Sequence, residues 1–176
     1  MAIPKKKIPS IKETISEIKF SGVFDYDKFY RGIYSWFKER LYDVHETAYK
    51  HKATPKGPEV EISFKGERKQ SEWIMYKVSV DLHIWDMTDV EVVKDGKKQK
   101  LNKGRMTIVI NMEVVFDYEK RFEEKPFYIQ LYNLLVDNIL WMKLMLGPVD
   151  TLYYEVYTLH TEIKKILNME TAYSAF

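Results

Sequence analysis

The chain has 176 residues, of which 45% are hydrophobic and 15% aromatic, and this length fits one compact domain with a buried core. Its 28 Lys and Arg residues against 26 Asp and Glu leave a net charge of +2, which excludes both the overall basicity of a dedicated nucleic-acid-binding protein and the composition of a disordered chain. The absence of cysteine excludes disulfides, Cys-ligated metals and a thiol nucleophile.

The N-terminal residues are basic, with Lys5, Lys6 and Lys7 between two prolines. A signal peptide would need an apolar run of about 7–15 residues here, and none follows, so we predict a cytoplasmic protein. We assign residues 1–13 to a flexible basic tail, 14–170 to a single domain and 171–176 to a C-terminal tail, because no repeat or change of composition marks a second domain.

The first third of the chain predicts a strand, a helix and a second strand. The strand is expected over Ile15–Phe20, and Asp25 or Asp27 can cap a helix that runs to about Tyr42. Apolar residues recur along that helix at spacings of three and four, at Phe29, Ile33, Trp36, Phe37 and Leu41. A strand over Val44–Ala53 then leads to a turn rich in proline and glycine.

The middle of the chain alternates apolar and polar residues at the period of half-buried strands. We predict strands over Val60–Phe64, Trp73–Asp86, Val90–Val93 and Arg105–Tyr118, with a turn over Gly66–Ser71. Asp95-Gly96 predicts a hairpin, because glycine accepts the positive φ of a tight turn, and Lys97–Leu101 would be its return arm or a loop. Two strands of about fourteen residues each imply a strongly bent antiparallel sheet.

Two helices are expected at the C-terminal end. The apolar helix Phe127–Leu146 opens after Pro126 and ends at Gly147-Pro148. Five polar or charged residues interrupt it, and a buried charge would cost about 2.5–3.5 kcal/mol in a bilayer, so we predict a buried or interface helix and no membrane span. Asp150 then caps a second, amphipathic helix over Thr151–Met169.

The predicted fold is therefore α+β: a curved antiparallel sheet of about five to seven strands on a long C-terminal helix, with one N-terminal helix and one extra C-terminal helix. Over Ile15–Leu146 this order resembles the helix-grip fold of the START and Bet v1-like superfamily, in topology only. The chain has no counterpart of the glycine-rich loop of plant members, and it has one N-terminal helix in place of a pair. The resemblance implies a hydrophobic cavity that holds lipids, sterols, polyketides or similar molecules.

A cavity of this kind would be lined from the sheet and from the long helix. The sheet side would supply Tyr76, Val78, Val80, Ile108, Ile110 and Met112. The helix side would supply Tyr128, Leu131, Leu135, Asn138, Ile139 and Met142. The alternative is that the same residues fill a solid core.

The four histidines offer few combinations for chemistry. His45 and His51 would stand about 20 Å apart on one strand and cannot share a metal ion. Asp81 and His83 share one face of a predicted strand, and if the two long strands pair, His83 could also approach Glu113. A carboxylate beside an imidazole is the minimum for general acid–base catalysis, so an enzyme that uses His83 with Asp81 or Glu113 is a third hypothesis. The alternative is a solvated sheet surface with cross-strand polar pairs, and we predict no metal site and no cofactor.

The predicted hairpin gathers six cations: Lys94, Lys97, Lys98, Lys100, Lys103 and Arg105. They could contact a polyanion such as a nucleic-acid backbone, but no aromatic residues alternate with them for base stacking. A lysine-rich edge that keeps the sheet soluble is the alternative.

No motif of nucleotide binding, zinc proteolysis or serine hydrolysis is present, so the sequence favours a non-enzymatic protein. The first hypothesis is a domain that binds an apolar small molecule or lipid between sheet and helix. The second is a structural or interaction protein, because the aromatic C-terminal helices carry more apolar surface than a monomer of this size easily covers. Such a protein would self-associate or dock a protein partner.

Overall fold

The computed structural model describes residues 10–54, 57–94, 97–119 and 145–169. Their elements follow in the order β1 (Ser10–Phe24), α1 (Tyr26–Glu39), β2 (Asp43–Thr54), β3 (Gly57–Lys69), β4 (Ile74–Lys94), β5 (Lys97–Phe116) and α4 (Asp150–Ile166). A π-helical turn, Met145–Val149, leads directly into α4. The described chain is thus an α+β protein with one N-terminal helix, as predicted.

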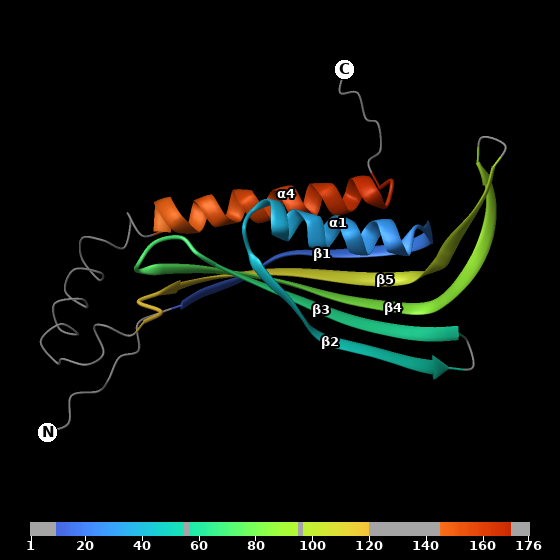
Figure 1. Cartoon of the computed structure of the whole chain (residues 1–176), viewed down its shortest axis with the longest axis horizontal. Helices are drawn as coiled ribbons and strands as arrows, with labels where there is room; N and C mark the ends of the chain where they lie inside the picture. The colour runs from blue at the N-terminus through green and yellow to red at the C-terminus, as the bar shows by residue number, and fades with distance from the viewer. Residues whose placement is uncertain (1–9, 55–56, 95–96, 120–144, 170–176) are drawn as a thin grey trace, which may run out of the picture.

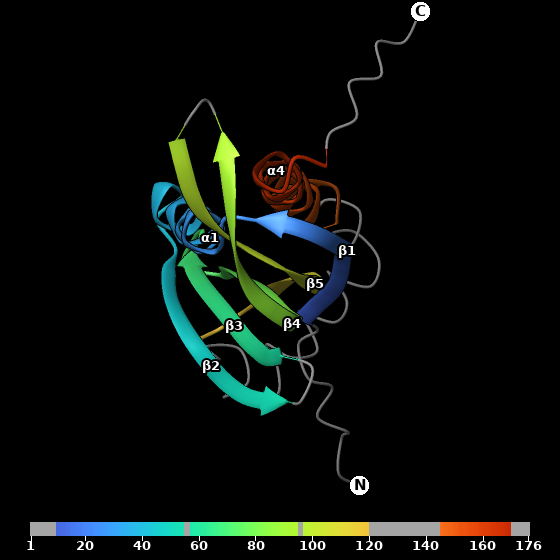
Figure 2. The same cartoon turned by 90° about the vertical axis from the view of Figure 1, so that its right-hand side faces the viewer.

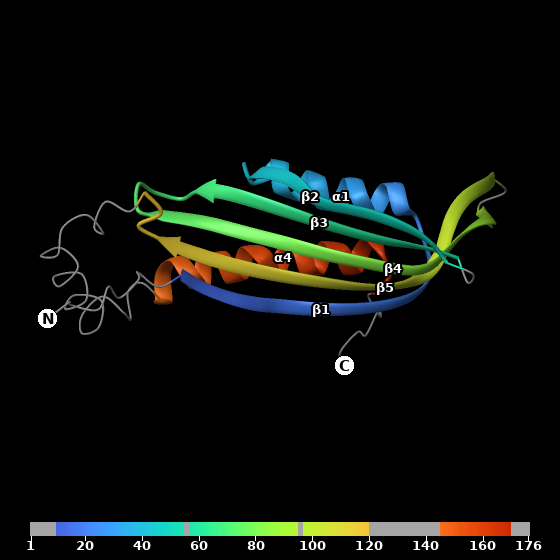
Figure 3. The ribbon, with the colours of Figure 1, turned by 90° about the horizontal axis from the view of Figure 1, so that it is seen from below.

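All five strands form one antiparallel sheet in the order β1-β5-β4-β3-β2. Both helices lie on one side of the sheet (Figures 1 and 2). Seen from below, the opposite face of the sheet is covered by no described helix (Figure 3). The described fold therefore has two layers, with a covered inner face and an uncovered outer face.

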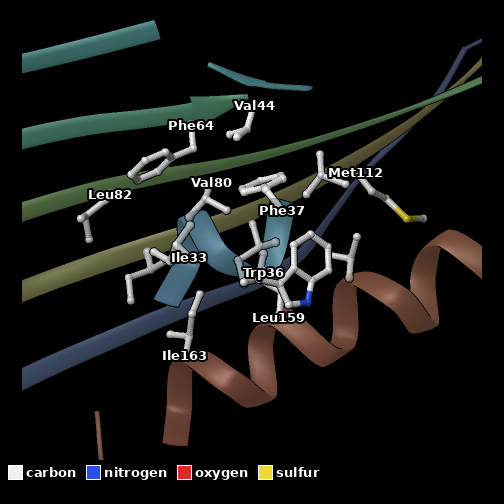
Figure 4. Close-up of a cluster of buried hydrophobic side chains, with 14 of the residues drawn as sticks. Ile33, Trp36, Phe37, Val44, Phe64, Val80, Leu82, Met112, Leu159 and Ile163 are labelled. Carbon is white, nitrogen blue, oxygen red and sulfur yellow. The ribbon is translucent and has the colours of Figure 1, made fainter. Parts of the chain in front are cut away.

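The alternation of apolar and polar residues explains these two faces. Residues such as Val60, Ile62, Val80, Ile108 and Ile110 point inward and are at most 3% exposed. They pack against Phe29, Ile33 and Phe37 of α1 and against Val156, Leu159 and Ile163 of α4, which form the same hydrophobic core (Figure 4). Burial of these side chains supplies the main stabilisation of the two layers.

Helix α1 begins where its capping signal predicts. The Asp25 carboxylate accepts a hydrogen bond from the Lys28 backbone N–H at 2.9 Å, which satisfies one of the free N–H groups of the first turn. We expect Asp25→Ala to lower the free energy of unfolding by about 1 kcal/mol in a urea titration, and Asp25→Asn to lower it much less. Equal losses in the two variants would contradict this role of the cap.

Several predicted boundaries differ from the structure. Strand β1 begins at Ser10 and so includes residues 10–13, which we assigned to the tail. Strand β3 continues through the predicted turn over Gly66–Ser71 as far as Lys69. Asp150 is the first residue of α4 and not its cap, since the cap residue is Val149 and makes no side-chain hydrogen bond.

The predicted strands Trp73–Asp86 and Val90–Val93 are one continuous strand, β4, and both parts pair with β5. A bulge between Trp85 and Thr88, with Asp86 at φ 55°, interrupts the register without ending the strand. Beyond the bulge the two strands bend together into a long arm that extends past the rest of the sheet (Figure 1). The helix predicted over Phe127–Leu146 lies, up to residue 144, outside the described residues.

Candidate functional site

The predicted sheet side of the cavity is packed. Tyr76, Val78, Val80, Ile108, Ile110 and Met112 are 0–1% exposed and belong to the core that α1 and α4 complete. The structure therefore brings these six residues together on the inner face. The six residues of the predicted helix side (Tyr128, Leu131, Leu135, Asn138, Ile139 and Met142) lie outside the described part of the chain, so the cavity stays a prediction.

One inner-face residue has a polar partner at the end of the sheet. The Tyr76 hydroxyl donates to the Pro148 carbonyl at 2.8 Å, which ties β4 to the turn before α4. Burial raises the pKa of Tyr76 above its ordinary value. This hydroxyl therefore serves as a buried structural contact.

A partly buried ion pair joins α4 to the sheet beside Tyr76. Arg68 of β3 donates to both Glu155 oxygens of α4, at 2.9 and 2.7 Å, and also to the Arg40 carbonyl at 2.8 Å. The two side chains are only 20% and 16% exposed. The guanidinium also lies 4.5 Å from the centre of the Tyr42 ring. Burial, followed by the negative charge of Glu155, raises the pKa of Tyr42.

This ion pair was not predicted from the sequence. We expected Arg68 in a turn, whereas the structure continues β3 through it, and the sequence analysis gave Glu155 no role within the predicted last helix. The only signal available was an arginine and a glutamate on separate elements, which nearly every protein contains. The bidentate geometry orients α4 on the sheet.

The outer face of the sheet holds the predicted acid–base residues. Asp81 accepts hydrogen bonds from Ser63 at 2.7 Å and from Asn111 at 3.3 Å, and Asn111 accepts one from Thr14 at 2.7 Å. These contacts form a polar ladder across four strands. Asp81 is thus part of a structural network on the outer face.

His83 lies two residues along β4 from Asp81 and has other partners. Its Nε2 atom is 2.5 Å from Glu59 Oε1 and 3.9 Å from Glu61 Oε1, both on β3. The ring of Trp85 stacks on the imidazole with ring centres 3.8 Å apart. An imidazole with two carboxylates can exchange a proton or bind a cation.

The structure does not bring His83 and Glu113 together. His83 lies opposite Thr107 of β5, whereas Glu113 lies opposite Lys77, six residues away along β4. Glu113 instead lines a shallow hollow of about 230 Å³ on the outer face. The prediction for this pair depended on the register, which the alternating pattern leaves undetermined.

Glu59 and Glu61 are the residues that the sequence analysis missed. Both occupy polar positions of the alternating pattern around the predicted strand Val60–Phe64, but their partner across the strands was not predicted. The alternating patterns of β3 and β4 contain a signal for this contact: when Val60 pairs with Ile84, Glu61 lies beside His83. Choosing that register from the sequence requires knowing how long the connecting turn is.

The lysine-rich arm is partly described. Lys98, Lys100 and Lys103 lie on β5 in the arm, and Lys98 is 3.9 Å from Glu91 across the strands. Arg105 donates two hydrogen bonds to Asp86, at 3.1 and 2.6 Å. Lys94 and Lys97 pair through their backbones, and their side chains are outside the described residues. A polyanion contact by the arm stays a prediction.

Helix α4 carries an aromatic face directed away from the core. Tyr153, Tyr154 and Tyr157 are 38%, 69% and 50% exposed. The rings contact each other: Tyr153 is edge-on to Tyr154 at 5.7 Å and stacked with Tyr157 at 6.5 Å between ring centres. This face (Tyr153, Tyr154 and Tyr157) is called the tyrosine face below.

No family model matches this chain, and no curated protein matches its sequence. Within the described residues, no helix is long and apolar enough to cross a membrane. The function of the chain is therefore inferred from the geometry of its described residues.

Proposed function

We propose that this protein is a non-enzymatic interaction protein that self-associates through the tyrosine face of α4. The observation that carries the proposal is the cluster of three exposed tyrosines on one helix, in which the Tyr153 ring contacts both Tyr154 and Tyr157. Tyrosine is enriched at protein interfaces because it buries a large ring and keeps a polar hydroxyl. Ordered rings on the surface also lose little conformational entropy on binding.

The charges of α4 support a second copy of the chain as the partner. The exposed stripe that contains Tyr154 and Tyr157 begins at Asp150 and ends at Lys164 and Lys165. If two copies pair antiparallel around a two-fold axis at Tyr157, Asp150 of one copy faces Lys164 of the other, and Tyr154 faces His160. Opposite charges then meet at both ends of the pair, which favours the antiparallel arrangement.

Mass measurements at several protein concentrations test this proposal. We expect a dimer by native mass spectrometry and light scattering, and a monomer for Tyr154→Lys combined with Tyr157→Lys, because four buried lysines would oppose the interface. The control is Tyr49→Lys on β2, which is 56% exposed and should remain dimeric. A wild-type chain that is monomeric at every concentration would overturn the proposal.

A charge swap distinguishes this interface from nonspecific association. Asp150→Lys alone should weaken the dimer, because it brings lysines together at both ends. Adding Lys164→Asp to the same chain should restore the dimer, since each copy then offers the exchanged charges. Failure of the second change to restore dimerisation would contradict the antiparallel arrangement.

Binding of an apolar small molecule is the second candidate function. The support for it is the antiparallel sheet with two helices on one of its faces (Figure 1), since a layer of helices on a sheet is an arrangement in which a cavity can form. The inner-face residues are already packed, so a ligand would have to occupy space outside their present contacts. Native mass spectrometry distinguishes the two functions. A monomer with added non-protein mass favours ligand binding, and a ligand-free dimer favours self-association.

A further inference from the structure

We propose that Glu59, Glu61 and His83 form a binding site for a divalent first-row transition metal ion, with zinc as the expected occupant. One ligand atom from each of the three side chains lies within 4.8 Å of the others. The three side chains come from neighbouring strands β3 and β4 and share the outer face of the sheet. This inference is independent of self-association, which uses α4.

The donor set selects the class of metal. One imidazole nitrogen and two carboxylate oxygens suit zinc and its neighbours, whereas calcium and magnesium prefer sites made of oxygen only. Three protein ligands leave a fourth position of a tetrahedron. The side chains are 20–32% exposed, so water can take that position.

The distances require only small movements of side chains. Zinc binds nitrogen and oxygen ligands at about 2.0–2.2 Å, so tetrahedral ligand atoms lie about 3.3–3.5 Å apart. The His83–Glu59 and His83–Glu61 contacts, at 2.5 and 3.9 Å, bracket this spacing. Rotation of the glutamate side chains can supply adjustments of about 1 Å, while the strands hold the backbone in place.

Trp85 holds the imidazole in position. Its ring stacks on His83 at 3.8 Å with the planes 24° apart, which restricts rotation of the imidazole about its side-chain bonds. A ligand whose orientation is set before binding loses less entropy when the metal arrives. The stack also places an indole beside the site, where a paramagnetic ion should quench its fluorescence.

Two lysines set the strength of the site. Lys50 and Lys52 of β2 lie 3.5 and 3.8 Å from the Glu61 carboxylate. They compensate the negative charge in the absence of metal, and they compete with the ion for Glu61. We therefore expect moderate affinity, which should increase when Lys50 is replaced by glutamine.

Titration with Co²⁺ and Zn²⁺ tests the site in the full chain, without an affinity tag and after treatment with a chelator. We expect one equivalent of Co²⁺ to produce visible absorption bands and to quench tryptophan fluorescence, and Zn²⁺ to displace it with 1:1 stoichiometry by calorimetry. His83→Asn, Glu59→Gln and Glu61→Gln should each weaken Zn²⁺ binding by at least about tenfold. Trp85→Phe should keep the absorption bands and lose part of the quenching.

The chain offers two matched controls. His45→Asn removes a histidine that is 3.2 Å from Asp43 on β2, and Glu67→Gln removes a carboxylate paired with Lys77 on the same outer face. Both should bind Zn²⁺ as the wild-type chain does. Absence of a 1:1 complex in the wild type, or an unchanged affinity in folded His83→Asn, would overturn the proposal.

Discussion

Replacing Glu155 by alanine is expected to lower the free energy of unfolding by about 2–4 kcal/mol, because the variant leaves Arg68 charged and unpaired beneath α4. The full penalty for breaking a buried pair is about 3–5 kcal/mol, and the residual exposure of both side chains reduces it. Urea denaturation followed by circular dichroism measures this loss. Arg68→Met combined with Glu155→Leu should recover most of the stability, since no buried charge remains.

The exposed pair Lys77–Glu67 supplies the control for this experiment. Its Nζ–Oε1 distance is 2.7 Å, as short as the closest contact of Arg68 with Glu155, but its side chains are 36% and 49% exposed. Glu67→Ala should therefore cost less than about 1 kcal/mol. A comparable cost for the two alanine variants would show that burial does not govern the Arg68–Glu155 pair.

Gly66→Ala is expected to destabilise the fold by about 1–3 kcal/mol, and Gly66→Val by more. A Cβ atom at this position would lie 2.5 Å from the Phe37 ring and 3.2 Å from Tyr42 Cβ. Phe37 is fully buried and contacts Trp36 and Tyr42, so its ring cannot move without disturbing the packing of α1 on the sheet. Thermal and urea unfolding of the two variants measure the loss.

Gly147→Ala is the matched control, because a Cβ atom there meets no atom of the described residues within 4 Å. It should leave the stability within about 0.5 kcal/mol of the wild type. If Gly66→Ala were equally neutral, close packing of Phe37 on β3 would not be the reason for glycine at this position. Comparison of the two variants therefore distinguishes the steric clash at Gly66 from the loss of conformational entropy in the unfolded chain that any Gly→Ala substitution causes.

Local patterns were enough to predict the secondary structure of the described residues in outline. The period of α1 and its Asp25 cap, and the alternation along β3, β4 and β5, depend on neighbours in the sequence, and the structure confirms the elements they predict. The ends of elements were less accurate. Gly66 was read as a turn because glycine favours turns, whereas here it makes room for Phe37.

The candidate sites depended on information that the alternating pattern lacks. Alternation places His83, Glu59 and Glu61 on an outer face, but a shift of the register by two residues would keep every residue on its face and change every partner. The same holds for Arg68 and Glu155, whose meeting depends on how α4 lies across the sheet. Such long-range pairs come from packing and not from local preference.

The sequence by itself determined the class of fold, the inner and outer faces of the strands and the aromatic character of the last helix, because these follow from residue type and local period. Only the tertiary structure decided that His83 meets Glu59 and Glu61 and not Glu113, and that Arg68 pairs with Glu155. The physical reason is that partners across strands and helices are chosen by the closest packing of the whole core, which includes side chains far apart in the sequence.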